Sequence, residues 1–290
     1  MEKAYLASWK LLREKMKKER KEDLELIDKV EESDIIVVSG QYDFIENVFQ
    51  SLGIPHTVTS PEEVGDFPLS SRQLLLIDCP GYLDDRGIEK VRGFVRDGGF
   101  LFTTDWSLQN VLEKAFPGFV EYNGRPTGDE VVKIEILDIE HPLVRGVVED
   151  REEPVWWLEG SSYPIRILDR DKVRVLIKSE ELKEKYGESP VAVTFRVGGG
   201  RVIHMISHYY LQRSEFRTER QMKSAEEYAA EKGIAAPAIK SELKDLSLGE
   251  VESAYSSAQF LANVLAEQRK QVKKLEKKGK KETDKQKSKK

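Results

Sequence analysis

The chain has 290 residues, a formal charge of −5 and a hydrophobic content of 39%. Such an apolar content excludes wholesale disorder, and the length corresponds to one large domain or two average ones, each able to build a core. The single cysteine excludes an internal disulfide and a cysteine-based zinc cage.

The charge is distributed unevenly. Residues 269–290 contain twelve Lys or Arg and three Asp or Glu, so this tail carries +9 and the rest of the chain −14. An acidic body does not favour nucleic-acid binding, although the tail could contact phosphates weakly. No apolar run is long enough to span a membrane, and the first residues lack a signal-peptide pattern, so we expect no membrane contact and a cytoplasmic location.

Residues 1–33 are predicted to form an amphipathic helix. Tyr5, Trp9, Leu12 and Met16 recur at helical spacing and share one face. This face must pack on the body of its own chain, which we favour, or on a second copy. The second case would give a homo-oligomer that associates through the terminal helices.

Residues 34–118 alternate between the two kinds of element. Apolar runs predict strands at 34–39, 56–59, 73–79 and 100–104, and helical spacing predicts helices at 41–52, 87–96 and 108–115. Strict alternation with short connections is typical of a parallel sheet that is covered on both faces.

The second half of the chain is first rich in strands and then helical. Strands are predicted at 131–137, 173–177, 191–197 and 201–207, followed by a long helix at 251–275. The predicted organisation is therefore an N-terminal helix (1–33), an α/β domain (34–213), a C-terminal helical extension (214–275) and a basic disordered tail (276–290). We expect deletion of residues 269–290 to leave thermal stability unchanged.

Ligands of an open parallel sheet bind at the carboxyl ends of its strands. This rule gives candidate ligand-binding residues at the ends of the predicted strands: Gly40, Gln41, Asp78, Gly81, Tyr82, Trp106, Ser107, Tyr209 and Tyr210. Trp157 joins them because residues 156–164 concentrate aromatic and hydroxyl groups, which could stack on a ligand as a lid. Alternatively, one Trp of this segment faces the core and the other packs on the N-terminal helix.

Residues 34–210 resemble the class I glutamine amidotransferase-like superfamily, especially its trehalose-utilisation-type branch. The resemblance rests on the order of strands, on segments 75–82 and 95–99, and on segment 200–208. It implies a flavodoxin-like three-layer α/β sandwich with a mostly parallel sheet, here with N- and C-terminal helical extensions. Active members carry a nucleophilic cysteine in a Gly-x-Cys-x-Gly turn, often with a glutamine four residues on, and a histidine followed two residues later by a glutamate.

This chain departs from that pattern at the nucleophile. Aligning Gln109 with the family's glutamine places Asp105 at the cysteine, with Thr103 and Ser107 at the glycines. A carboxylate is a weak nucleophile toward amides. We therefore expect a catalytically degenerate protein that binds a small ligand or a protein partner.

The histidine position is retained. His208 matches the family's histidine, and Tyr210 stands in place of its glutamate. The alternative to a degenerate protein is thus a hydrolase that acts on a small polar, amide or sugar-like substrate through Asp105 and His208, with Tyr210 or Cys79 assisting. Cys79 is the less favoured catalytic candidate, because it is also explained as a small buried residue that closes the third strand.

Three roles are possible for the pair of Asp105 and His208. They could form a structural hydrogen bond, an acid–base pair, or part of a metal site completed by Asp78 or His204. His204 and His208 are four residues apart, which on a strand separates them by about 13 Å. This separation disfavours a shared metal, and we predict no metal and no cofactor.

Overall fold

The computed structural model describes residues 1–209, 211–234 and 239–287, with side chains described as far as residue 277. Within this part of the chain, a central sheet has the strand order β2-β1-β3-β4-β12-β11-β10-β7. Its strands are β1 (Ile35–Val38), β2 (Thr57–Thr59), β3 (Leu74–Ile77), β4 (Phe100–Thr104), β7 (Glu135–Ile136), β10 (Arg174–Lys178), β11 (Pro190–Val197) and β12 (Gly200–Met205).

The first half of the sheet is parallel, as the alternation of elements predicts. β1 pairs in parallel with β2 and β3, β4 pairs in parallel with β3 and β12, and the remaining pairs are antiparallel. Every residue of β1, β3 and β4 is buried. These continuous apolar runs are therefore the central strands of a sheet that is covered on both faces.

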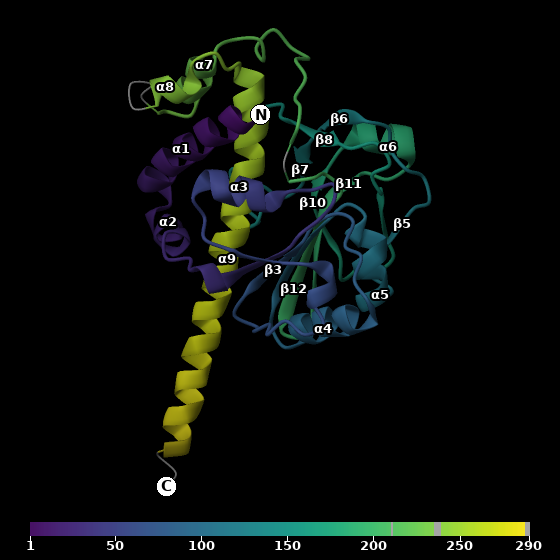
Figure 1. The fold of residues 1–290 in the computed structure, drawn as a ribbon. Coiled ribbons are helices and arrows are strands. Elements are labelled where there is room, and N and C mark those ends of the chain that lie inside the picture. Colours follow the sequence, from purple (N-terminus) through teal and green to yellow (C-terminus); the bar gives the residue numbers. More distant parts are fainter. Residues whose placement is uncertain (210, 235–238, 288–290) are drawn as a thin grey trace.

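Helices lie on both sides of this sheet (Figure 1). On one side are α3 (Ile45–Leu52) and, beyond it, the terminal helices α1 (Glu2–Glu19), α2 (Lys21–Ile27) and α9 (Leu248–Lys287). On the other side are α4 (Asp85–Arg96) and α5 (Glu113–Ala115), which follows a π-helical turn, η3 (Leu108–Leu112). The fold is thus an α/β sandwich of the flavodoxin-like type.

The remaining elements are short. Two small antiparallel pairs join β5 (Val120–Tyr122) to β9 (Ile165–Ile167) and β6 (Glu130–Lys133) to β8 (Val155–Leu158). The other helices are α6 (Glu180–Tyr186), α7 (Ala225–Glu231), α8 (Lys240–Leu243) and the single turns η1 (Glu32–Asp34) and η2 (Pro61–Glu63). None of the described helices has both the length and the apolar character that crossing a lipid bilayer requires.

The N-terminal helix packs on its own chain. The Tyr5 hydroxyl donates to the carbonyl oxygen of Tyr209 (2.6 Å) and to Ser257 Oγ of α9 (3.1 Å), and Ser8 Oγ donates to the carbonyl oxygen of Val251 (3.0 Å). One hydrophobic core runs from α1 and α9 into the sheet. The helical extensions are therefore part of the body of the molecule.

Four predicted segments differ in the structure. The predicted N-terminal helix breaks at Arg20, whose side chain bonds Asp23 and Asn263 and so turns α2 toward α9. The predicted helix at 41–52 begins only at Ile45, because Asp43 accepts the backbone amides of Phe44 and Tyr209 and holds the preceding residues in a turn.

The predicted strand at 131–137 is divided at Ile134, where the chain passes from β6, paired with β8, to β7, paired with β10. The expected disordered tail is instead a continuation of α9 as far as Lys287, since extending an anchored helix avoids the cost of nucleation. Residues 288–290 of the predicted tail lie outside the described residues.

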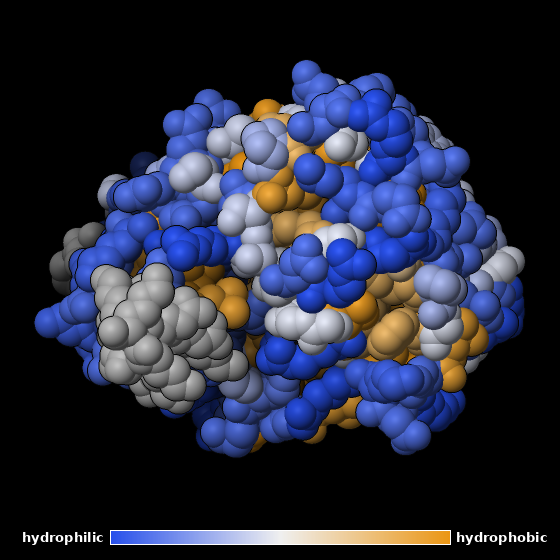
Figure 2. Space-filling model, turned by 90° about the horizontal axis from the view of Figure 1, so that it is seen from below, coloured by the Kyte–Doolittle hydropathy of each residue, from blue (hydrophilic) through white to orange (hydrophobic). Residues whose placement is uncertain are grey.

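The surface seen along the projecting end of α9 is mostly hydrophilic, with small separate hydrophobic areas (Figure 2). Exposed large apolar residues are scattered along the described chain: Tyr42, Val58, Tyr82, Leu137, Ile139, Leu168, Phe216 and Met222.

Candidate functional site

The carboxyl ends of three neighbouring strands bring the predicted catalytic residues together. Cys79 follows β3, Asp105 follows β4 and His208 follows β12, and these strands are adjacent in the sheet. His208 Nε2 lies 3.1 Å from Asp105 Oδ2, and the Cys79 thiol lies 4.0 Å from the same oxygen. The rule that sites form at strand ends therefore predicts this cluster correctly.

Asp105 occupies a sharp bend after β4. Its φ of +42° is unusual for a residue with a side chain, and its amide donates to the carbonyl oxygen of Met205 (2.9 Å). Its carboxylate accepts from the Ser162 hydroxyl (2.9 Å), the Tyr163 amide (2.8 Å) and His208. Burial raises the pKa of Asp105, and these hydrogen bonds offset only part of that effect.

His208 is held between two carboxylates. Glu159 Oε2 lies 2.9 Å from Nδ1, at ion-pair distance but without hydrogen-bond alignment, while Nε2 faces Asp105. Burial lowers the pKa of His208, but Asp105, Cys79 and Glu159 outweigh it and raise that pKa well above its ordinary value. These neighbours therefore favour the protonated form of the ring.

Cys79 is a neutral thiol in this arrangement. Burial raises its pKa to about 11, which the nearby His208 lowers only in part. Its backbone is fixed on both sides, because its amide donates to Thr104 Oγ1 and its carbonyl oxygen accepts from Gln41 and Tyr42. A thiolate, the form that attacks carbonyl carbon, is therefore absent at neutral pH.

Residues 159–163, here called the covering segment, lie over this cluster. They provide the bonds from Ser162 and Tyr163 to Asp105 and the carboxylate beside His208. Asp105 is 2% exposed and His208 is 1% exposed, so no open pocket reaches them. The sequence indicated residues 156–164 as a possible lid, but it did not indicate that Glu159 of this segment would lie beside His208.

The two tryptophans of this region are both buried. Trp156 donates from Nε1 to Ser256 Oγ (2.9 Å) of α9, the C-terminal helix. Trp157 stands edge-on to His208, with ring centroids 5.8 Å apart, and bonds Asp129 through Nε1. Trp157 thus closes the cluster from a second side.

Several predicted ligand-binding residues serve the backbone of the site instead. Gly40 and Gly81 lie where the chain passes closely, since an added Cβ would come within 2.3 Å of the Cys79 carbonyl oxygen and the Ser107 hydroxyl respectively. Asp78 is buried, and its carboxylate accepts the Ile45 amide (3.1 Å). Burial and the neighbouring Asp43 and Glu46 raise the pKa of Asp78 well above its ordinary value.

Two further candidates are placed differently from the prediction. Ser107 is buried, with its hydroxyl 3.3 Å from the carbonyl oxygen of Asp78. Tyr209 is fully buried and its hydroxyl donates to the carbonyl oxygen of Ser257, so its side chain is directed toward α9 and has no exposed surface for a ligand. Tyr210 lies outside the described residues.

An aromatic surface covers the outer side of the site. Tyr122 stacks on Tyr163 (centroids 3.9 Å apart), Tyr163 stacks on Trp106 (5.3 Å) and Tyr42 meets Trp106 edge-on (5.4 Å). Tyr82 is 54% exposed and Gln41 is also exposed. Tyr82, Trp106 and Gln41 are thus among the predicted residues that remain accessible.

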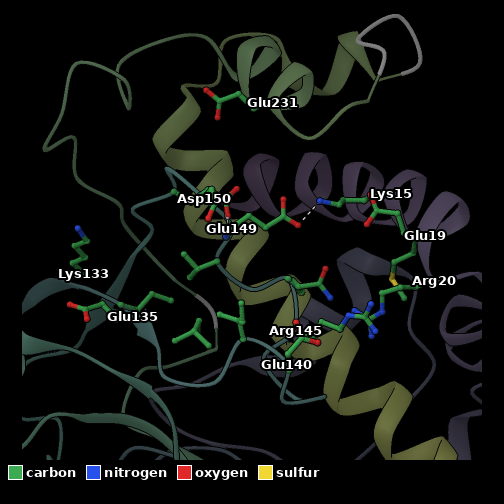
Figure 3. Close-up of a pocket in the computed structure, with 18 residues that line it drawn as sticks. Lys15, Glu19, Arg20, Lys133, Glu135, Glu140, Arg145, Glu149, Asp150 and Glu231 are labelled. Atoms are coloured by element: carbon green, nitrogen blue, oxygen red, sulfur yellow. Dashed lines mark hydrogen bonds and ion pairs between the residues drawn. The ribbon is translucent and has the colours of Figure 1, made fainter.

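A cavity of about 870 Å³ lies away from these residues, between α1, α9 and the connection from β7 to β8 (Figure 3). We call it the charged cleft. Its apolar lining is Met16, Ile134, Ile136, Ile139 and Val148, and its charged lining is Lys15, Glu19, Arg20, Lys133, Glu135, Glu140, Arg145, Glu149, Asp150, Glu152 and Glu231. None of the predicted catalytic or ligand-binding residues lines the cleft, because its walls come from segments that only the tertiary structure brings together.

The carboxylates of the charged cleft are only partly neutralised. Lys15 pairs with Glu149 (2.5 Å), as the dashed line in Figure 3 marks, and the buried Lys232 pairs with Glu149 and Glu152. Glu19, Glu140 and Asp150 form no ion pair among the described residues. The cleft therefore presents a surplus of negative charge over an apolar floor.

The fold and the strand-end cluster define a flavodoxin-like α/β sandwich. No protein-family model and no curated protein sequence matches the chain. Similar solved structures include a putative GMP synthase protein from Thermoplasma acidophilum (TM-score 0.45, 14% identity, covering 63% of this chain and 85% of that one). A putative ThuA-like protein from Bacteroides uniformis is similar at a TM-score of 0.44 and 10% identity, over 62% of this chain and 83% of that one.

A β-galactosidase from Bacillus circulans is similar over part of its length (TM-score 0.41, 14% identity, covering 64% of this chain). This chain spans 31% of that protein. None of these similarities assigns a function.

Proposed function

We propose that this protein is an amidotransferase-like binding protein that does not hydrolyse amides and that holds a small cationic ligand in the charged cleft. The proposed absence of amide hydrolysis depends on the residue at position 105 and on its hydrogen bonds. A buried carboxylate with three hydrogen-bond donors stands where the superfamily resemblance places a thiol.

This arrangement lacks the parts of an amide hydrolase. Amide hydrolysis through a covalent intermediate needs a strong nucleophile and a base that accepts its proton. Asp105 is a weak nucleophile whose oxygens are already bonded, and Cys79 stays protonated because its pKa is raised to about 11. The groups around His208 raise its pKa and favour its protonated form, which is a poor base.

The ligand class follows from the charged cleft. Its volume lies in the range of small-molecule sites, and its apolar floor would bury the carbon skeleton of a ligand. Glu19 on α1 and Glu140 and Asp150 on the β7–β8 connection lie on different walls of the cleft (Figure 3). Carboxylates without partners on two walls favour an amine cation on an apolar chain.

Calorimetric titration with spermidine, a flexible triamine, tests this proposal. We expect binding that weakens with added salt, and no binding of adipate, a dianion of similar length. Glu19→Gln with Glu140→Gln should weaken spermidine binding about tenfold, because each exposed pair contributes up to about 1 kcal/mol. Glu62→Gln, which lies outside the cleft, is the control.

Equal affinity in the double variant and in the wild type would contradict the placement of the ligand. Absence of spermidine binding to the wild type would contradict the ligand class.

The alternative function, a hydrolase acting on a small amide or sugar-like substrate, has one observation in its favour. Glu159 lies at Nδ1 of His208 while Asp105 lies at Nε2, which gives the histidine the orienting carboxylate of a catalytic triad. Turnover of a small amide that is abolished in His208→Ala would favour this alternative.

A further inference from the structure

We propose that Cys79, Asp105 and His208 bind a divalent transition-metal ion, with Zn²⁺ as the ion that suits them best. One potential ligand atom from each residue, a sulfur, a carboxylate oxygen and a ring nitrogen, lies within 4.8 Å of the other two. All three residues are buried. This proposal does not rest on the binding function proposed for the charged cleft.

Two distances among the potential ligand atoms are close to those expected around a single ion. Zn–S bonds of about 2.3 Å and Zn–N or Zn–O bonds of about 2.0 Å place tetrahedral ligands roughly 3.2–3.8 Å apart. His208 Nε2 and Asp105 Oδ2 are 3.1 Å apart, and the sulfur is 4.0 Å from that oxygen. Small movements of side chains would therefore bring all three atoms to an ion.

The charges also suit a dication. Metal binding displaces the thiol proton of Cys79 and the proton on Nε2 of His208, so that cysteine and aspartate together supply two negative charges and histidine binds as a neutral ring. A neutral assembly is favoured in a buried site, where an unpaired charge is costly. The mixture of sulfur, imidazole and carboxylate is a donor set that selects zinc over magnesium or calcium.

The backbone of each ligand is held in place without the metal. The Cys79 amide bonds Thr104 Oγ1, and the Asp105 amide bonds the carbonyl oxygen of Met205. His208 stands between Ser207, which bonds Trp157, and Tyr209, whose amide bonds Asp43. A site built on anchored strand ends is preorganised for binding.

Glu159 supplies the outer contact that metal-binding histidines usually have. Its carboxylate lies 2.9 Å from Nδ1 of His208, the ring nitrogen that would not bind the metal. Once aligned to accept a hydrogen bond from Nδ1, such a carboxylate fixes the tautomer and raises the basicity of the other nitrogen. The Glu159 side chain is 34% exposed, so we propose that an ion enters the cluster from the side of this residue.

This ligand set differs from the one that the sequence allowed for and then set aside. Asp78 bonds the Ile45 amide, and His204 bonds Thr103 Oγ1 through Nδ1 (2.8 Å), so neither completes the cluster. Cys79 takes their place. With three protein ligands, one coordination position remains for water or for a donor atom of a bound molecule.

Titration of tag-free, chelator-treated full-length protein with Co²⁺ tests the proposal, because Co²⁺ replaces Zn²⁺ and reports its ligands by absorption. We expect about one ion per chain, a thiolate-to-cobalt charge-transfer band, and displacement of Co²⁺ by Zn²⁺. Cys79→Ser should lose the band. Glu159→Gln should keep the band but bind about 10–100-fold more weakly, since it changes only the outer contact.

His56→Gln, a histidine outside the cluster, is the matched control and should bind as the wild type does. Circular dichroism of each variant confirms that it is folded. A wild-type titration without a charge-transfer band overturns the proposal, whatever the variants do. Metal affinity that is unchanged in Cys79→Ser, or lost in His56→Gln, overturns it as well, because the ion then binds elsewhere.

Discussion

Two histidines at the end of β12 have opposite electrostatic surroundings. His204 is fully buried and bonds only Thr103, so burial lowers its pKa to about 3. His208, four residues on, lies among Asp105, Cys79 and Glu159, and its pKa is raised. The difference follows from their partners, since desolvation alone acts against the charged form of both rings.

His204 should make the protein less stable in mild acid. Its pKa is near 6.5 in the unfolded chain and about 3 in the folded one, so the unfolded chain binds a proton first as the pH falls. Above pH 6.5 the titration of His204 does not lower the free energy of unfolding. Below pH 6.5 it lowers this free energy by about 1.4 kcal/mol per pH unit, so that about 2 kcal/mol is lost at pH 5. Urea unfolding of the wild type and of His204→Gln at pH 7 and pH 5 measures this.

The pH dependence that His208 contributes has the opposite sign. Its pKa is raised in the folded protein, so it adds stability at low pH, and this stability is lost as the pH rises through that pKa. The comparison with His204→Gln removes this background, because both proteins contain His208. An equal loss of stability between pH 7 and pH 5 in both proteins would contradict the assignment to His204.

Part of the site could be predicted from single residues. Cys79, Asp105 and His208 follow buried strands, and the strand-end rule places them at one edge of the sheet. Glu159 could not be predicted, because the covering segment reaches the cluster from a loop and no local pattern reports that approach. Tyr209 was misplaced for a related reason: its ring turns into the core toward α9.

At the scale of elements, α9 joins the parts of the molecule. It contacts α1 through Tyr5 and Ser8, and its later turns reach the opposite end of the sheet. There Gln268 bonds the carbonyl oxygen of Arg72, Arg269 pairs with Asp34 and Gln271 bonds the carbonyl oxygen of Gly98. These contacts argue against the expectation that deleting residues 269–290 leaves thermal stability unchanged.

Two truncations locate the end of the stabilising part of α9. A chain ending at Gln268 loses the Arg269 and Gln271 contacts and the burial of Val272, and we expect its free energy of unfolding to fall by about 3 kcal/mol. A chain ending at Lys277 should match the full chain. Thermal unfolding of the three proteins measures the difference, and equal melting temperatures for all three would show that these contacts contribute nothing.

The elements of the sheet were easier to predict than their terminal partners. Runs such as 74–77 and 100–104 are apolar at nearly every position, which is typical of a strand covered on both faces. The apolar face of α1 indicated only that some other surface must cover it. That this surface is α9, more than 240 residues away, depends on the tertiary structure.

At the scale of the whole molecule, one core connects two separate sites. The strand-end cluster is closed by the covering segment and Trp157, whereas the charged cleft opens between the terminal helices and the β7–β8 connection. A closed polar cluster and an open charged cleft suit different roles. The first favours a fixed structure or a bound metal, and the second favours a ligand that enters and leaves.

The loss of amide hydrolysis is the claim on which the proposed function depends, and release of ammonia from L-glutamine by the full-length protein tests it most directly. We predict no release above the protein-free reaction, because residue 105 supplies a bonded carboxylate and Cys79 stays a neutral thiol. Ammonia release that disappears in both Cys79→Ala and His208→Ala would contradict this account.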